Sequence, residues 1–379
     1  MFSVAIELGA AGTLSHYQPL PVSADLRGYA SERSQIRAEA GTDRLVSITG
    51  LSARYCPTGR DIYLEKVDKL DTLSWERSVI GKVVDSILVD LHRIGLEQMD
   101  DAFEESVRTG QDVNFTDLET SIATAGENAA RTQLLSEWKY AGSDGDLKNA
   151  TLDEFAARIA GNSGADLIAN TLAAIVDLIQ YETKLLIRYL RRCRHGRFGL
   201  RHFSKSSLWM AEARATLTRL QTGVTLDTKK HPARMFAVSP NVRPDFLYAV
   251  TLIGDIKTGK YYQFQESVAT GYAIFAEYVL ARRINTAFIL SIELDLSAGH
   301  LRNHRVIRVH VDDQQRQLWI TQRDFALKVL RANSIPPHPS DLQPCRECPY
   351  SHHCWEGGEP GATPLRPGTP LAAPSAGTQ

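Results

Sequence analysis

The sequence predicts an α/β or α+β protein built on a mixed sheet, and several features of its 379 residues agree on this. From Arg234 the apolar residues change from a helical to a strand-like period, which indicates a sheet region. A helix expected over Gln263–Arg283 falls between these strands, and another over Arg323–Ala332 follows them. Before this region the chain is helical and rather polar over residues 95–190, with a long helix from Ala165 to Arg192. The expected strands are Met235–Val238, Asp245–Lys257, Ala287–Leu294, Arg305–Val311 and Gln317–Ile320.

Composition indicates a globular protein of the cell interior. Apolar residues make up 43% of the chain, enough for a large core in one elaborated domain or two. The 43 basic and 44 acidic residues nearly cancel, so any nucleic-acid binding must use local patches. No Lys or Arg precedes Arg27 and no apolar run reaches about eighteen residues, so we expect neither a signal peptide nor a membrane span. Five cysteines, an odd number, favour a cytoplasmic protein whose cysteines serve a metal rather than disulfides.

The chain divides into five expected segments. The first has no chemistry that we can assign, and the last is rich in Gly, Pro and Ala without periodicity, so we expect it to be disordered. Between them lie a helical lobe with one cysteine and a basic helix, the sheet region, and a cysteine-rich motif. In the lobe, a helix expected over Gly81–Arg93 carries its apolar residues on one face. The five segments are 1–46, 47–233, 234–334, 335–356 and 357–379.

The stretch over residues 243–259 carries the first candidate site. It is rich in strand-formers, with Asp245 near its start and Asp255, Ile256 and Lys257 near its end. On a strand, Asp255 and Lys257 point to one side and Ile256 points into the core. If the stretch bends back as a hairpin, Asp245 can reach the same side. Two carboxylates and a lysine there can hold a hard divalent cation and orient a water, although Asp-x-Lys also occurs by chance at solvated hairpin ends.

The cysteines carry the second candidate site. Cys345, Cys348 and Cys354 form a C-x2-C-x5-C motif, in which local chain closure lets three thiolates face one centre. A fourth ligand must come from elsewhere, and Cys56, just ahead of an expected helix, is the natural candidate, whereas Cys193 is expected to pack or stay free. Four thiolates suit a tetrahedral zinc ion or an iron–sulfur cluster, and spacing alone does not separate the two. Such a centre would clamp both ends of the chain together, so its loss is expected to destabilise the whole fold.

The expected long helix leads into a basic run between Lys184 and Lys205, which contains no acidic residue. Aromatic residues interleave with the basic ones, at Tyr189, Phe198 and Phe203. Cations that follow phosphates beside rings that stack bases suit a single-stranded nucleic acid, and the alternative is a solvated helix face. The candidate DNA-binding residues are Arg188, Arg191, Arg192, Arg194, Arg197 and Arg201.

Four blocks of sequence together resemble the CRISPR-associated RecB-like nucleases of the adaptation machinery, which are iron–sulfur proteins of the PD-(D/E)xK type. The resemblance is strongest to their archaeal type I-A branch. The blocks are the run from Tyr55 to Leu64 that contains Cys56, the pair Pro244 and Asp245, the run from Gly254 to Gly259, and the motif from Cys345 to Cys354. Their order and the division of the cysteines into one plus three carry the resemblance, which covers residues 47–95 and 234–355.

The resemblance implies a restriction-endonuclease-like core with a [4Fe-4S] cluster on Cys56, Cys345, Cys348 and Cys354. It implies DNA cleavage that depends on Mg²⁺ or Mn²⁺ and is usually exonucleolytic on single strands. It also implies a role in trimming or selecting fragments for insertion into a CRISPR array alongside the integrase. Carried over position by position, the metal ligands are Asp245, Asp255 and the Ile256 carbonyl, and Lys257 positions the attacking water. The residues themselves suit this chemistry, because phosphodiester hydrolysis needs charge neutralisation and an oriented nucleophile.

The sequence departs from the family's pattern at two places. The family commonly has a histidine four residues after a helical glycine, whereas Gly81 is followed by Asp85, which can also coordinate Mg²⁺ or Mn²⁺. Relatives often carry a glutamine four residues before a tyrosine on the helix after the lysine. Here Gln265 and Tyr272 are seven apart, which still places them on one helix face two turns from each other.

Two other functions remain open. The same nuclease core could serve recombination or repair, as in RecB/AddB-type proteins, and would then act with a partner because the chain has no Gly-x4-Gly-Lys-Ser/Thr helicase loop. The chain could also be a non-catalytic DNA-binding scaffold that carries zinc or a cluster. Asp85 in place of histidine favours the scaffold, and the intact pair Asp255 and Lys257 speaks against it.

Overall fold

In the computed structural model, the residues described are 1–10, 21–29, 47–52, 56–70, 75–143, 164–195, 205–226, 236–238, 242–249, 251–332, 334–346, 348, 350–355 and 364. Arg197 and Arg201 lie outside these residues, as does the predicted disordered tail apart from Pro364. Most of the predicted N-terminal segment also lies outside them.

The strands of the described residues form one five-stranded sheet in the order β1-β2-β3-β4-β5. Neighbouring strands are antiparallel except β3 and β4, which are parallel and are connected through helix α9. The predicted mixed sheet in an α/β fold is therefore confirmed. The strands are β1 Leu220–Thr222, β2 Phe246–Tyr248, β3 Leu252–Thr258, β4 Thr286–Asp295 and β5 His300–His310.

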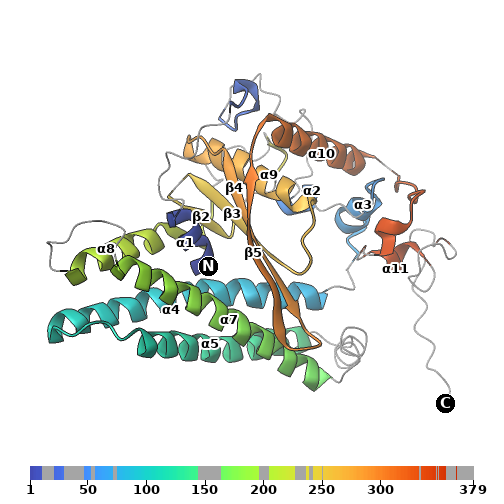
Figure 1. Cartoon of the computed structure of the whole chain (residues 1–379). Coiled ribbons are helices and arrows are strands. Elements are labelled where there is room, and N and C mark those ends of the chain that lie inside the picture. The colour runs from blue at the N-terminus through green and yellow to red at the C-terminus, as the bar shows by residue number, and fades with distance from the viewer. Residues whose placement is uncertain are drawn as a thin grey trace, which may run out of the picture.

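Helices cover both faces of the sheet (Figure 1). Helices α4, α5 and α7 form the layer on one side, with α1 and α8 packed on α7, and helices α9, α10 and α2 form the layer on the other. No described helix is both long and apolar enough to span a membrane. The helices are α1 Phe2–Ala10, η2 Ala24–Leu26, α2 Ile48–Ser52, α3 Arg60–Lys66, α4 Trp75–Thr109, α5 Phe115–Ser143, α7 Gly164–His195, α8 Lys205–Thr218, α9 Phe264–Leu280, α10 Asp313–Arg331, η5 Gln343–Arg346 and α11 Ser351–Cys354.

Alternate side chains of the central strands point to the two helical layers. Ile256 and Leu290 are buried in the core shared with α4 and α7, whereas Ile253 and Ile289 are buried against α9. This alternation is the two-residue period of a strand. The odd-numbered residues of β3 therefore face α9, and Ile256 lies in the opposite core, as predicted.

The predicted strand Gln317–Ile320 is wrong, because these residues lie inside α10. The helix begins ten residues before the predicted helix start at Arg323, where the Asp312 side chain accepts a hydrogen bond from the backbone N–H of Gln315 at 2.9 Å. That bond is an N-cap, which satisfies one of the unpaired donors of the first turn. The buried side chains then recur at helical spacing through Trp319, Ile320 and Leu327. Phe236–Val238, within another predicted strand, also belongs to no strand of the sheet.

Two buried carboxylates tie the N-terminal segments to the core. Glu277 of α9 pairs with Arg316 of α10 at 2.8 Å and with Arg27 at 2.6 Å. Glu182 of α7 accepts hydrogen bonds from the hydroxyl of Ser3 and lies 2.8 Å from His304 of β5. Buried charges need such partners, because an unpaired one costs several kcal/mol.

Candidate active site and cysteine pocket

The β2–β3 hairpin brings Asp245 and Asp255 together. In the register of the two strands Phe246 pairs with Gly254, so one step further out Asp245 faces Asp255. Gly254 is required here because the Phe246 ring lies over it: a Cβ at this position would stand 1.8 Å from the ring. Pro244 has no N–H to donate, and the strand ladder ends beside it. Among the residues that the structure describes, no strand therefore pairs with this edge of β3 from Asp255 onward.

Asp245 takes the place of the missing strand at this open edge. Its Oδ2 accepts a hydrogen bond from the backbone N–H of Ile256 at 2.5 Å. In a strand, the N–H and the C=O of one residue point to the same side, so the Ile256 carbonyl also faces this edge. The two aspartates and the carbonyl of Ile256, which were singled out from the sequence as metal ligands, thus lie at one place.

Lys257 is held against Asp255. Its Nζ lies 2.5 Å from Asp255 Oδ2, and the Asp255 side chain is almost fully buried. Burial by itself would lower the pKa of Lys257, but the Asp255 and Asp245 carboxylates outweigh it and hold the pKa above its usual range. The lysine is therefore a cation at neutral pH, with one fifth of its side chain exposed.

Asp85 approaches the same edge from helix α4. Gly81, one turn before it, packs so closely on β3 that a Cβ there would lie 2.9 Å from the Thr258 hydroxyl. Burial, and then the Asp255 carboxylate, raise the pKa of Asp85 to about 7. Burial and the two other carboxylates likewise raise the pKa of Asp245 well above its usual range. The carboxylates repel one another, which is the electrostatics of a site suited to a cation.

Tyr272 borders this group, whereas Gln265 lies in the first turn of α9 and bonds the chain just before that helix. The Tyr272 hydroxyl lies 3.4 Å from the Thr49 hydroxyl of α2, and burial together with Asp255 raises its pKa to about 12. Gln265 is buried, and its side-chain oxygen accepts from the backbone N–H of Tyr262 at 3.3 Å. This contact occupies Gln265 at the first turn of α9.

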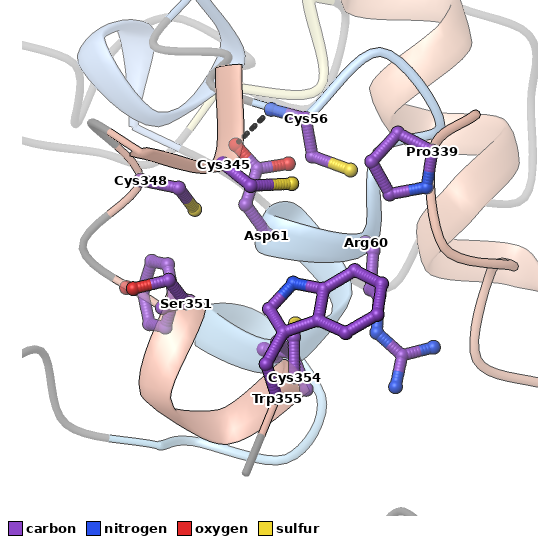
Figure 2. A pocket seen from close by; sticks show the side chains of 11 residues that line it. Cys56, Arg60, Asp61, Pro339, Cys345, Cys348, Ser351, Cys354 and Trp355 are labelled. Atoms are coloured by element: carbon purple, nitrogen blue, oxygen red, sulfur yellow. Dashed lines mark hydrogen bonds between the residues drawn. The ribbon is translucent and has the colours of Figure 1, made fainter. Parts of the chain in front are cut away.

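The four cysteines singled out from the sequence line one pocket (Figure 2). Cys56 comes from the loop before α3, and Cys345, Cys348 and Cys354 come from the C-terminal motif. The pocket measures about 310 Å³, including space open to solvent. All four thiols are free of disulfides. Cys193 is also a free cysteine and is half-buried on α7, away from this pocket, in line with its expected packing role.

The surroundings of these thiols fit a bound cationic centre. Burial raises the pKa of Cys345 and Cys354, and that of Cys348 to about 12, and the neighbouring thiols add to each rise. A metal deprotonates coordinating thiols outright and so relieves this cost. The indole N–H of Trp355 also lines the pocket, where it lowers the pKa of the Cys345 thiol against the effect of burial. Figure 2 shows this N–H between the Cys345 and Cys354 side chains.

Neither the acidic residues at β3 nor the four cysteines form a complete coordination sphere. In the parts of the chain that the structure places, no three Asp, Glu, His or Cys side chains are gathered as a finished metal site. Mg²⁺ commonly binds one or two protein carboxylates and keeps several waters as ligands. A group of carboxylates at β3 that does not surround the ion is therefore compatible with Mg²⁺.

The basic end of α7 lies apart from the acidic group. Arg188, Arg191, Arg192 and Arg194 are exposed, but Arg194 pairs with Asp112 at 2.5 Å. The guanidinium groups of Arg191 and Arg194 each also lie 5.8 Å from the Phe115 ring. Helix α4 runs 24 residues from position 85 to its end at 109, next to Asp112, and this separates the two places by about 36 Å.

Sequence reasoning missed the neighbours of the thiols. Arg60 is buried, donates to the Pro336 carbonyl at 2.7 Å, and lowers the pKa of the Cys354 thiol against the effect of burial. Asp61 accepts from the backbone N–H of Cys56 at 3.3 Å and fixes the loop that carries this thiol. Arg60 and Asp61 lie four and five positions after Cys56, so the proximity of charged residues to a ligand cysteine was the available signal.

One comparison with known proteins gave a match. The family model described as CRISPR-associated exonuclease Csa1 matches residues 167–357, which is 191 of the 379 residues. The matched range contains the whole sheet, with Asp245, Asp255 and Lys257, and the three clustered cysteines, but not Asp85 or Cys56. No curated protein and no solved structure matches the chain.

Proposed function

The chain belongs to the CRISPR-associated exonuclease Csa1 family, and from this premise we propose that it is a metal-dependent DNA exonuclease acting mainly on single strands. The family confirms the CRISPR-associated nuclease expected from the sequence. The observation that carries the proposal is the convergence of Asp85, Asp245 and Asp255 with Lys257 at the open edge of β3. Three mutually repelling carboxylates beside a half-buried lysine would destabilise the fold, and a bound cation would relieve this repulsion.

Asp245, Asp255 and the Ile256 carbonyl would hold Mg²⁺ or Mn²⁺, with Asp85 as a further ligand from α4. When bound, such an ion neutralises phosphate charge and makes a bound water more acidic. Lys257, kept charged by Asp255, donates hydrogen bonds to the scissile phosphate and orients the attacking water. Tyr272 closes the site on the side of α9 and α2.

We further propose that the four cysteines hold a [4Fe-4S] cluster. Four free thiols that line one pocket and come from two segments far apart in the chain match the ligand set of such a cluster and support this proposal. Hydrogen bonds to the sulfurs tune such clusters, and Trp355 and Arg60 are placed to donate them. When bound, the cluster cross-links the loop before α3 to the C-terminal motif.

The proposed biological role is to trim or select DNA fragments for CRISPR adaptation, in the cytoplasm and beside the integrase complex. The family description and the resemblance of the four sequence blocks support this role. We also propose that the sheet with α4 and α9 is a restriction-endonuclease-like core, since a β-hairpin followed by a parallel crossover presents both aspartates and the lysine.

The test is cleavage of end-labelled single-stranded and duplex DNA with Mn²⁺, Mg²⁺ or EDTA. We expect the wild type to shorten single strands with either metal, and Asp255→Ala and Lys257→Ala to lose the activity while their circular dichroism stays unchanged. Lys328→Ala, at an exposed lysine on α10, is the matched control and retains activity. Equal rates for the wild type and both site variants, or no cleavage at all by a cluster-loaded protein, would favour the scaffold function instead.

A further inference from the structure

The segment between β3 and α9 (Figure 1) directly follows the proposed active site along the chain. Its sequence carries aromatic residues and a lysine. Gly259 turns the chain with a φ of +94° while its N–H donates to the Ile292 carbonyl at 2.7 Å. Beyond this turn, the rings of Tyr262 and Phe264 stack with their centroids 5.6 Å apart and their planes 15° from parallel. The Lys260 ammonium lies 5.4 Å from the Tyr262 ring.

This segment is anchored and still accessible. Tyr261 donates its hydroxyl proton to Glu266 at 2.6 Å, and Glu266 also accepts from the Gln315 side chain at 3.3 Å. Tyr262 and Phe264 are half-exposed, and Lys260 is exposed. Because the two rings are already fixed and partly accessible, an unpaired base can stack on them with little loss of conformational entropy.

A second cationic side chain, Arg305, lies across the sheet from the proposed active site. Lys257 pairs in register with Ser291 of β4, and Ser291 pairs with Arg305 of β5, so the three side chains share one face. Two strand spacings, about 10 Å, separate the backbone positions of Lys257 and Arg305. Arg305 is exposed, and no described carboxylate forms an ion pair with it, unlike its neighbour Arg302, which pairs with Glu293.

We propose that Lys260, Tyr262, Phe264 and Arg305 form a subsite for the unpaired end of a DNA strand beside the scissile bond. The proposal rests on the nuclease function proposed above and explains its preference for single strands. The two rings stack bases, which a duplex keeps buried in its own stack, and the two cations neutralise adjacent phosphates. Charged edge strands also serve merely to prevent aggregation, and this simpler role of Arg305 is one outcome of the test.

The test measures binding without cleavage. An Asp255→Ala parent in EDTA is titrated with a labelled single strand and with a labelled blunt duplex, and binding is followed by fluorescence anisotropy. Tyr262→Leu and Phe264→Leu preserve apolar bulk but remove the ring. We expect each to weaken single-strand binding about 5- to 150-fold, with little change for the duplex. Tyr262→Phe keeps the ring and is expected to bind as the parent does.

Salt dependence isolates the cations. Arg305→Gln is expected to reduce the slope of log affinity against log salt by about 0.7 for the single strand, whereas the ring variants leave that slope unchanged. Arg302→Gln is the matched control and is expected to change neither affinity nor slope.

Three results would overturn the subsite: parental affinity in both leucine variants, equal losses for single strand and duplex, or a parent that binds no single strand. The outcome is separable from that of the nuclease proposal. Ring-dependent binding without wild-type cleavage would refute the catalytic function alone, and cleavage with unaltered binding in the leucine variants would refute the subsite alone.

Discussion

Substitution of Gly81 by alanine tests whether the close approach of α4 to β3 sets the position of Asp85. The added Cβ would lie 2.9 Å from the Thr258 hydroxyl oxygen, about half an ångström inside the 3.4 Å where ordinary contact begins. If the helix retreats by that amount, Asp85 moves with it, because the two residues are one turn apart on α4. A misplacement of about 1 Å costs about 100-fold in rate, so we expect Gly81→Ala to lose about tenfold in cleavage rate.

Stability is expected to change differently from activity. Alanine is more favourable than glycine inside a helix by about 1 kcal/mol, which offsets the crowding at Thr258. The free energy of unfolding of Gly81→Ala, measured in urea with EDTA, is therefore expected to stay within about 1 kcal/mol of the wild type. A fall in activity at unchanged stability would separate positioning from unfolding.

Thr258→Ala removes the oxygen that the new Cβ would meet and provides the rescue. We expect the double variant Gly81→Ala with Thr258→Ala to regain most of the lost rate, and Thr258→Ala alone to have the smaller effect. Rates are measured on single-stranded DNA with Mn²⁺. Full activity in Gly81→Ala, or a loss that the double variant does not restore, would refute the reasoning.

The remaining predictions concern the cysteine pocket, the basic helix and a buried histidine. Cys56→Ser and Cys348→Ser are each expected to lower iron and sulfide content and the thermal midpoint by similar amounts, with Cys193→Ser unchanged; full iron in Cys56→Ser would exclude it as a ligand. Arg192→Glu is expected to weaken DNA binding and to reduce its salt slope, and an unchanged slope would assign the helix end to solvent. Burial lowers the pKa of His92 to about 4. As the pH falls below about 6.5, the imidazole is therefore protonated in the unfolded chain before it is protonated in the folded protein, which lowers the stability of the folded protein. The wild type is then expected to lose about 2 kcal/mol more stability between pH 7 and 5 than His92→Leu in urea unfolding, and parallel pH profiles would contradict this.

Local features of the site could be predicted because strand geometry fixes them within a few residues. The alternation of Asp255, Ile256 and Lys257 follows from the two-residue period of β3. The hairpin then brings Asp245 to its hydrogen-bond partner Ile256, which lies only eleven positions later in the chain. Residues Gln317–Ile320 were predicted as a strand although they are helical, because four residues are too few to distinguish a helical from a strand-like apolar period. The N-cap at Asp312 marks the true start of this helix.

Most elements and the motifs they carry could be predicted from local sequence: the hairpin acids and lysine, the cysteine triplet, and the long amphipathic helices. Each of these depends on backbone geometry and on side chains a few residues apart. Other contacts could be learned only from the packed structure: Gly81 of α4 lies against β3, Asp112 pairs with Arg194, and Trp355 lines the cysteine pocket. These contacts join residues that are far apart in the chain or point from separate elements, and they exist only after every element between them has packed.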